Sequence, residues 1–275
     1  PLPPAPMDLS LNNHVTVVTG GASGIGRAVA AAFAAEQARV AIWDVSADVE
    51  RVAADLAGPS GRAVVGCHVD VTDRGSIAAA LAATEAALGP VEHLVHAAAT
   101  GSGKFGFPFT SLTPDDWPRV LEVNVMGMVN VAHALAPGLV ERRRGTMIYI
   151  ASVAGQIGSQ TDPPYSASKA ANINFAQCLA KDLAPHGVRV NTICPGMVRT
   201  PLNRAVWQAW HDRQPPEHRR GYEDWAGEKV RAVVPLGRWQ QPEDVADMAV
   251  FLSSARAGEV TGQTINVDGG FVMHW

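Results

Sequence analysis

Residues 15–26 read Val-Thr-Val-Val-Thr-Gly-Gly-Ala-Ser-Gly-Ile-Gly. The β-branched run at the start predicts a buried strand, and the glycines behind it permit a sharp turn into a helix. The spacing is G-x-x-x-G-x-G rather than the common G-x-G-x-x-G, so on its own this stretch could be plain turn chemistry. Free N–H groups and the positive dipole at a helix start nevertheless attract a pyrophosphate, and the candidate contacts are Gly20, Ser23, Gly24, Ile25 and Gly26.

The rest of the chain repeats this unit of strand and helix. Strand-like runs fall at residues 40–43, 63–68, 93–96, 147–150, 188–193 and 264–267, and stretches of helical period at 26–37, 47–56, 76–88, 115–140, 166–183 and 243–252. Strands that alternate with helices of this length form βαβ crossovers, which bury a parallel sheet between two helical layers. The pattern predicts an α/β fold with a doubly wound parallel sheet of seven strands.

We expect a single domain over residues 9–275, preceded by a flexible, proline-rich tail at 1–8. No linker or internal repeat divides the chain, and one stretch, about 197–231, interrupts the pattern. A segment that long inside a compact domain is usually functional. Because Trp207, Trp210 and Trp225 fall inside it, we expect a packed, partly helical lid over a substrate site.

Composition excludes several classes of protein and of site. The 22 Lys and Arg stand against 26 Asp and Glu, so no excess positive charge is available for a nucleic acid. No uninterrupted apolar run reaches the ~18 residues of a membrane span. The three cysteines and nine histidines show no ligand spacing, so we expect no disulfide, no metal site and a cytoplasmic location.

Acidic residues follow the next two strands. Asp44 ends the second predicted strand, where a carboxylate can bind both hydroxyls of an adenosine ribose and repel a 2′-phosphate. It therefore favours NAD over NADP, unless it only caps the next helix. Asp70 and Val71 follow the third strand and could hold the adenine edge, although Asp70 could equally be a helix cap.

The most specific local signal is Tyr165-Ser166-Ala167-Ser168-Lys169. Residues at i and i+4 share a helix face, so Tyr165 and Lys169 would project into one cleft. Ser152 follows a predicted strand at the carboxyl edge, where open α/β sheets bind ligands. The three side chains are therefore expected to converge.

Together with the glycine turn and Asp44, these residues resemble the single-domain branch of the short-chain dehydrogenase/reductase family over residues 9–270. The resemblance implies a Rossmann-like fold, a nicotinamide cofactor, and hydride transfer between that cofactor and a carbonyl or alcohol carbon. It also implies that Asn124 holds a water that links Lys169 to solvent. Further matches are Glu122-Val123-Asn124-Val125, Pro195-Gly196, Val198 and Thr200 near the cofactor, and the stretch 262–270.

The implied chemistry explains these residue types. An alcohol loses hydride only as its proton leaves, so a base must lie within hydrogen-bond reach, and Tyr165 is the candidate. We expect the Lys169 ammonium to lower the pKa of Tyr165 and so favour the phenolate. The hydroxyl of Ser152 would stabilise the developing alkoxide.

One stretch departs from the family. Where Asn-Asn-Ala-Gly is usual after the fourth strand, this chain has His96-Ala97-Ala98-Ala99. Ala97 can still offer its backbone to the cofactor, but Ala99 cannot adopt the positive φ of glycine without strain, so we expect a shifted turn. His96, at the end of a buried strand, is expected to be structural.

Substrate contacts are expected from Gln156 and Gln160, which lie between Ser152 and Tyr165, and from Trp207 in the lid. Polar groups that face an aromatic wall suit a sugar, a polyol or a hydroxylated ring. A 3-oxoacyl thioester or a hydrophobic, steroid-like ketone stays open as the alternative, as does a non-catalytic NAD-binding redox regulator. The resemblance also implies a homotetramer, formed through the helices at 115–140 and 166–183 and the final strand.

Overall fold

All seven predicted strands form, and they pair in parallel in the order β3-β2-β1-β4-β5-β6-β7. The computed structural model describes residues 8–59, 61–105, 109–158 and 162–273. The order reverses between β1 and β4, and open α/β sheets bind ligands in the crevice at such a switch. The strand bounds are β1 Val15–Thr19, β2 Arg39–Asp44, β3 Val64–His68, β4 His93–His96, β5 Gly145–Ile150, β6 Val188–Pro195 and β7 Thr264–Val267.

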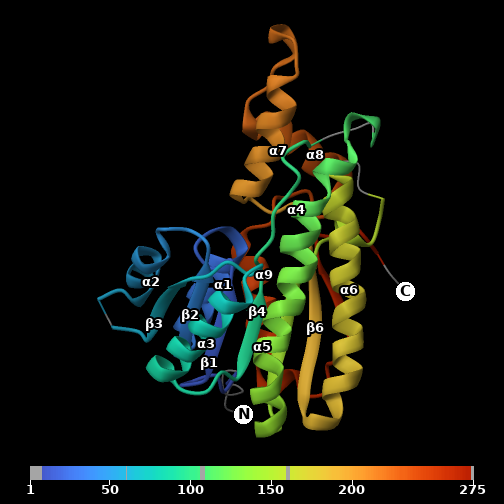
Figure 1. Ribbon diagram of the computed structural model, residues 1–275. Helices are drawn as coiled ribbons and strands as arrows, with labels where there is room; N and C mark the ends of the chain where they lie inside the picture. Colours follow the sequence, from blue (N-terminus) through green and yellow to red (C-terminus); the bar gives the residue numbers. More distant parts are fainter. Residues whose placement is uncertain (1–7, 60, 106–108, 159–161, 274–275) are drawn as a thin grey trace, which may run out of the picture.

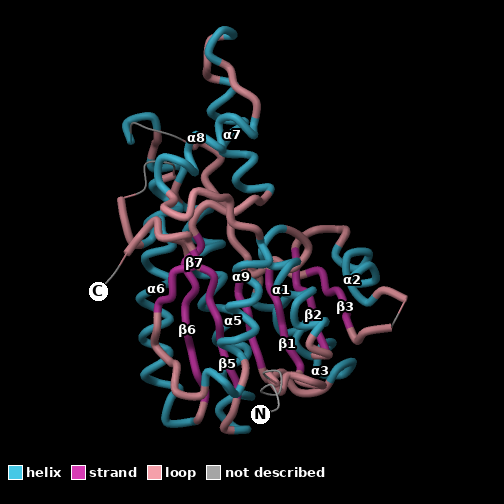
Figure 2. Tube along the Cα trace, turned by 180° about the vertical axis from the view of Figure 1, so that it is seen from behind, coloured by secondary structure: helices cyan, strands magenta, loops and turns pink. Residues whose placement is uncertain are grey.

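Two helical layers cover the sheet, which confirms the doubly wound prediction (Figure 1, and Figure 2 from behind). Alternate residues of a strand face opposite layers, as in β2, where Ile42 packs into one core cluster and Trp43 into the other. One layer holds α1 Gly24–Ala35, α2 Val49–Ala57 and α9 Pro242–Ser253, and the other holds α3 Arg74–Leu88, α5 Gly127–Arg142 and α6 Pro163–Leu183.

The helix predicted at 115–140 is not regular. A 3₁₀ turn at Pro114–Asp116 is followed by α4 Pro118–Leu121, a π-helical turn η3 at Glu122–Met126, and then α5. Pro118 opens α4, and the wider π turn changes which side chains and carbonyl groups leave the helix inward. The prediction of one continuous α-helix was therefore wrong in this detail.

The same segment bears on the question of a membrane span. By length and composition Pro114–Arg142 could cross a membrane, with 29 residues and a mean hydropathy of 1.4 in its most apolar window. Charged residues at 115, 116, 119 and 122 interrupt its apolar sequence. In the fold, Val131, Leu135 and Leu139 of this segment pack into the core against the sheet, which is the position of a core helix.

The segment between β6 and α9 projects beyond the carboxyl edge of the sheet (orange in Figure 1). It holds α7 Pro201–Asp212, a 3₁₀ turn at Pro216–His218 and α8 Tyr222–Val233. The two helices meet through aromatic rings, with the centroids of Trp210 and Trp225 6.1 Å apart. Two backbone hydrogen bonds join the ends of this segment. The N–H of Gln240 donates to the carbonyl oxygen of Met197 at 3.1 Å, and the N–H of Arg199 donates to the carbonyl oxygen of Gln240 at 3.0 Å.

The predicted tail, residues 1–8, is described only at Asp8. The carbonyl oxygen of Asp8 accepts a hydrogen bond of 2.9 Å from Nε of Arg256, beyond α9. Residues 1–7 lie outside the described part of the chain.

Candidate active site

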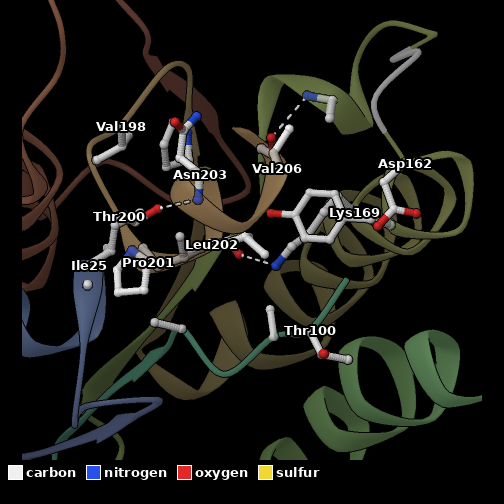
Figure 3. Close-up of a pocket in the computed structure, with 18 of the residues that line it drawn as sticks. Ile25, Thr100, Asp162, Lys169, Val198, Thr200, Pro201, Leu202, Asn203 and Val206 are labelled. Atoms are coloured by element: carbon white, nitrogen blue, oxygen red, sulfur yellow. Dashed lines mark hydrogen bonds between the residues drawn. The ribbon is translucent and has the colours of Figure 1, made fainter. Parts of the chain in front are cut away.

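A cavity of about 970 Å³ lies at the carboxyl edge of the sheet, below α7 and α8 (Figure 3). It is formed by the β1–α1 turn, the segments that follow β2 to β6, the start of α6 and the inner side of α7 and α8. One cavity therefore joins the predicted cofactor residues to the predicted catalytic residues. Of the predicted site residues it is lined by Gly20, Ser23, Gly24, Ile25, Gly26, Asp44, Asp70, Val71, Ala97, Ser152, Tyr165, Lys169, Val198 and Thr200.

The glycine turn has the shape that a pyrophosphate requires. Gly20 has a φ of +67°, and a Cβ there would lie 2.8 Å from the backbone nitrogen of Ala98. A Cβ at Gly26 would overlap the carbonyl oxygen of Gly20. The side chain of Ser23, at the N-cap of α1, makes no capping hydrogen bond. The first N–H groups of α1 therefore stay available to a phosphate, and these residues fit a dinucleotide.

Asp44 ends β2 at the cavity wall. Its Oδ2 accepts a hydrogen bond of 3.0 Å from the N–H of Ala22, and its Oδ1 one of 2.9 Å from the N–H of Ser46. The N-cap of α2 is Asp48, so Asp44 is not the helix cap of the alternative reading. The carboxylate instead fixes the glycine turn to the end of β2, with its remaining lone pairs near the cavity.

Asp70 and Val71 also reach the cavity, beyond β3. Oδ1 of Asp70 accepts hydrogen bonds from the N–H and the hydroxyl of Thr72, at 2.9 and 2.8 Å, and these bonds lower the pKa of Asp70. The N-cap of α3 is Asp73, whose carboxylate accepts from the N–H of Gly75. Asp70 therefore shapes the turn between β3 and α3 and does not cap the helix.

The turn after β4 explains how the chain tolerates its departure from the family pattern. Nδ1 of His96 lies 2.9 Å from Oγ1 of Thr19, and that hydroxyl also accepts from the N–H groups of Ala97 and Ala98, at 3.2 Å each. The non-glycine residues with positive φ in the described chain are Ser10, Asn13, Gln37 and Arg143. Ala99 does not have a positive φ, so the turn takes a course that needs no left-handed residue there.

His96 is structural, as expected. It is 4% exposed, and burial is the main cause that lowers its pKa to about 3. A histidine with that pKa stays neutral in the folded protein at physiological pH.

Ser152, Tyr165 and Lys169 come together as predicted. Ser152 precedes a 3₁₀ turn, η4 Val153–Gly155, just after β5, while Tyr165 and Lys169 lie in the first two turns of α6. Nζ of Lys169 lies 5.5 Å from the ring centre of Tyr165 and donates a hydrogen bond of 2.8 Å to the carbonyl oxygen of Ile150. Figure 3 shows this bond within the cavity.

The electrostatics of the pair differ from the expectation. Burial raises the pKa of Tyr165 above its ordinary value, and the hydrogen bond with Ser152 opposes that shift. Burial also lowers the pKa of Lys169 to about 8. The phenol is therefore neutral at physiological pH, and the lowering of its pKa that we expected from Lys169 is not among the causes of the shift.

Asn124 lies behind the cavity wall, in η3, and is 1% exposed. Its Oδ1 accepts from the N–H of Thr100 at 2.8 Å, and its Nδ2 donates to the carbonyl oxygen of Thr100 and to Oγ of Ser168, both at 2.9 Å. Its carbonyl oxygen accepts a bond of 2.8 Å from Nδ2 of Asn172. Asn124 thus joins the segment after β4 to the helix that carries Tyr165 and Lys169.

Two of the predicted substrate residues make contacts outside the cavity. Nε2 of Gln156 donates a hydrogen bond of 2.7 Å to Oδ1 of Asn266, so its amide is directed to β7 and away from the cavity. The indole of Trp207 donates to the carbonyl oxygen of Arg220 and packs on Tyr222, whereas Trp210, one turn further along α7, lines the cavity. Gln160 lies outside the described residues.

Two further residues that line the cavity are not among the substrate contacts predicted above. Asp162 is 3% exposed and precedes the Pro-Pro start of α6. Arg213 donates to the carbonyl oxygen of Phe105 and so joins the end of α7 to the segment after β4. An acidic residue before a helix is usually a cap, and a charged residue in a lid is usually solvated, so neither pattern distinguishes a site residue.

The chain is similar to known proteins over nearly its whole length. The chain matches the family model described as "Enoyl-(Acyl carrier protein) reductase" over residues 20–272. It is 36% identical to a galactitol 2-dehydrogenase from Agrobacterium fabrum over 269 residues, which are 95% of this chain and 98% of the relative. It is 32% identical to a 3-oxoacyl-(acyl-carrier-protein) reductase from Thermotoga maritima over 266 residues, which are 96% of this chain and 100% of the relative.

A solved structure is similar over the same length. It is an L-sorbose reductase from Gluconobacter frateurii in complex with NADPH and L-sorbose, with a TM-score of 0.88 and 29% sequence identity. The match covers 98% of this chain and 100% of that chain.

Proposed function

Because this chain belongs to the short-chain dehydrogenase/reductase family, we propose that it oxidises or reduces a sugar, a polyol or a hydroxylated ring with NAD. Membership makes it an NAD(P)-dependent oxidoreductase that interconverts a secondary alcohol and a ketone. The observation that carries the proposal is the meeting of Tyr165, Lys169 and Asp44 in one cavity.

In the direction of oxidation, the substrate hydroxyl gives its proton to the oxygen of Tyr165 while its carbon releases a hydride with both bonding electrons. NAD, which the glycine turn and Asp44 would hold, would supply the acceptor for that hydride. In reduction, the phenol of Tyr165 returns the proton to the carbonyl oxygen. The hydroxyl of Ser152, a hydrogen-bonding neighbour of Tyr165, stabilises the charge that develops on the substrate oxygen.

The pKa directions assign complementary roles to the pair. A buried phenol with a raised pKa stays protonated, which is the state that donates a proton in reduction, and it needs a positive charge nearby to act as a base. With a pKa of about 8, Lys169 is largely protonated at neutral pH and supplies that charge. Asn124, which fixes the backbone beside it, is proposed to hold the water that connects Lys169 to solvent.

Asp44 supports NAD rather than NADP as the cofactor. Its carboxylate is held at the cavity wall by the N–H groups of Ala22 and Ser46. Two like charges about 4 Å apart repel by roughly 4 kcal/mol at an effective dielectric constant near 20. A 2′-phosphate beside Asp44 would meet that repulsion, whereas ribose hydroxyls can donate to the carboxylate. NADPH in the L-sorbose reductase structure makes this a point to test.

The apolar wall that α7 and α8 form fits a second substrate class, the 3-oxoacyl thioesters, as well as sugars. Leu202, Val206, Trp210 and Trp225 line it from α7 and α8, and such a wall suits the C–H face of a sugar as well as an acyl chain. The galactitol and L-sorbose enzymes favour the first class by similarity, and the 3-oxoacyl reductase favours the second. The buried carboxylate of Asp162 in the same cavity favours a hydroxylated substrate.

The test is turnover of galactitol, other polyols, cyclic and aliphatic secondary alcohols and a 3-hydroxyacyl thioester with NAD⁺ or NADP⁺, followed by nicotinamide absorbance. We expect the highest kcat/KM with NAD⁺ and a polyol or sugar. A preference for the thioester or for NADP⁺ would overturn the corresponding part of the proposal.

We also propose that the chain works in the cytoplasm, apart from membranes and nucleic acids, as a homotetramer formed through α5, α6 and β7. Leu121 and Met126, just before α5, are 37% and 50% exposed, so apolar surface is available on that side. Light scattering should give four times the mass of the chain. A monomer at micromolar concentration would contradict this part.

A further inference from the structure

We infer that Asp162 is a substrate-binding residue, whose carboxylate accepts a hydrogen bond from a hydroxyl on the carbon next to the reacting carbon. The inference rests on the proposed function, since it assigns a partner to the substrate within the same site. It gives the enzyme a preference for vicinal diols, and for the hydroxyketones that they form, over simple secondary alcohols.

The first argument is position. Asp162 is the N-cap residue of α6, three residues before Tyr165, and it lines the same cavity. Figure 3 draws it on the opposite side of the view from Val198 and Thr200. A ligand held by Asp162 would therefore have its reacting carbon on the side of Tyr165.

The second argument is an unused hydrogen-bonding position. Oδ2 of Asp162 accepts a hydrogen bond of 2.8 Å from the N–H of Ser102. Oδ1 is buried and makes no hydrogen bond among the residues that the structure describes. The N–H of Tyr165 lies near enough to lower the pKa of the Asp162 carboxyl, but the side chain does not form a cap on its own helix. A buried carboxylate oxygen without a donor is unfavourable, so a native site that keeps one is expected to receive a donor from elsewhere.

The carboxylate can meet such a donor without losing its anchor. The Cβ–Cγ torsion of aspartate is broad, so a modest rotation turns Oδ1 toward the cavity. The bond to Ser102 holds the segment after β4 against the start of α6. A Cβ at residue 101 would lie 2.9 Å from Oδ2, so Gly101 leaves room for this contact.

The third argument is charge. The groups around Asp162 are Ser102, Tyr165 and Asp116, and the last is paired with Lys104 at 2.8 Å. Burial raises the pKa of Asp162, and Asp162 in turn raises the pKa of Tyr165. A neutral hydroxyl donor would stabilise the buried carboxylate and so oppose both pKa shifts. A substrate carboxylate or phosphate at this position would instead add a second negative charge. The site therefore selects a hydroxyl.

The test compares Asp162→Asn with Asp116→Asn, a control that removes a nearby carboxylate outside the cavity. The probes are cyclohexane-1,2-diol and cyclohexanol with NAD⁺. We expect wild type to favour the diol in kcat/KM, and Asp162→Asn to lose about 10- to 100-fold with the diol and less than about threefold with cyclohexanol. The control should keep the wild-type ratio. Equal losses with both alcohols, or no preference in wild type, would overturn the inference while leaving the oxidoreductase function intact.

A pH profile adds a readout that loss of packing would not move. Removal of a negative charge near Tyr165 lowers the pKa of that phenol, so the acid limb of kcat/KM should shift to lower pH in Asp162→Asn. NADH binding, followed by its fluorescence, should match wild type and shows that the variant is folded. If it does not, Asp162→Ser, which keeps an acceptor for Ser102, replaces it.

Failure of the proposed function is distinguishable. If wild type oxidises neither alcohol, the proposed substrate class is refuted. Binding of the diol to the NADH-loaded protein, measured by calorimetry, then decides the inference alone. Weaker binding in Asp162→Asn than in Asp116→Asn supports the role of Asp162, and equal binding overturns it.

Discussion

The ammonium of Lys169 donates a hydrogen bond of 2.8 Å to the carbonyl oxygen of Ile150, the last residue of β5. This bond connects the helix that carries the proton-transfer pair to the edge of the sheet that carries Ser152. Burial of the ammonium, and not this hydrogen bond, lowers the pKa of Lys169.

Replacing Lys169 by methionine should affect protein stability and turnover in different ways. The pKa of Lys169 falls from 10.5 to about 8 on burial, so its protonated form costs about 3 kcal/mol in the folded state relative to the neutral form. Because the folded pKa is the lower one, wild-type stability rises between pH 8 and 10.5, as the folded state releases its proton first.

In Lys169→Met this gain is absent. We therefore expect the free energy of unfolding of the variant, measured in urea relative to wild type, to be about 3 kcal/mol more favourable at pH 7 than at pH 10.5. Its turnover should fall at least about 100-fold. A stability difference that does not change with pH would contradict the buried charge.

Tyr165→Phe removes the group that exchanges the proton and keeps the ring. We expect kcat to fall by about 10²- to 10⁴-fold, the range for a positioned acid or base. The Kd for NADH, measured by fluorescence, should stay within about twofold of wild type, because the ring still packs in the same place. Retained turnover would refute its role.

Asp44→Asn keeps an acceptor for the N–H of Ala22 and removes the charge that opposes a 2′-phosphate. The ratio of kcat/KM for NAD⁺ to that for NADP⁺ should fall by about 10- to 100-fold, within the repulsion estimated for one charge pair. Asp48→Asn, on the exposed cap of α2, is the matched control and should leave the ratio unchanged. A ratio that stays constant in Asp44→Asn would assign the carboxylate to the turn alone.

The buried histidines predict a loss of stability in acid. His93 and His96 each have a pKa lowered to about 3, chiefly by burial. The unfolded chain binds their protons near pH 6.5 and the folded protein does not, so stability that is present above pH 6.5 is lost as the pH falls. From pH 7 to pH 5 each histidine should remove about 2 kcal/mol.

His96→Asn, which keeps a partner for Thr19, should recover that amount for one of them. The measurement is urea unfolding of both proteins at the two pH values. An identical pH dependence in wild type and variant would show that His96 titrates normally.

The two lid tryptophans offer a test of which side of α7 meets the substrate. Trp210→Leu should raise KM for the substrate severalfold with little change in NADH binding, because Trp210 lines the cavity. Trp207→Leu should change KM less, since that indole bonds to Arg220 on the outer side. The reverse order would mean that α7 turns when the substrate binds.

The elements that recur with a clear period were predictable. All seven strands agree within a few residues, because a β-branched run between glycine or charged residues has few alternative conformations. The pairing of Tyr165 with Lys169 followed from helical spacing alone. The π turn at Glu122–Met126 could not be predicted, since it depends on Asn124 reaching Thr100 and Ser168, which are distant in sequence.

The rest of the site could not be predicted, because the sequence does not show in which direction a side chain points. Gln156 lies in a segment next to the cavity, but its partner is Asn266, 110 residues away. Trp207 and Trp210 are three residues apart on α7, and only the packing of α8 decides which of them faces inward. Asp162 reads as a helix cap until the bond to Ser102 is known.

The hydrogen bonds between Met197, Arg199 and Gln240 close the base of the projecting segment, so the chain leaves and re-enters the sheet domain at a single point. Closing a loop costs only about 0.6 kcal/mol more for each doubling of its length. The segment can therefore be exchanged as a unit. A different pair of helices, longer or shorter than α7 and α8, could be grafted between these residues without moving β6, β7 or the glycine turn after β1. Substrate range in this chain can then be exchanged separately from its catalytic chemistry.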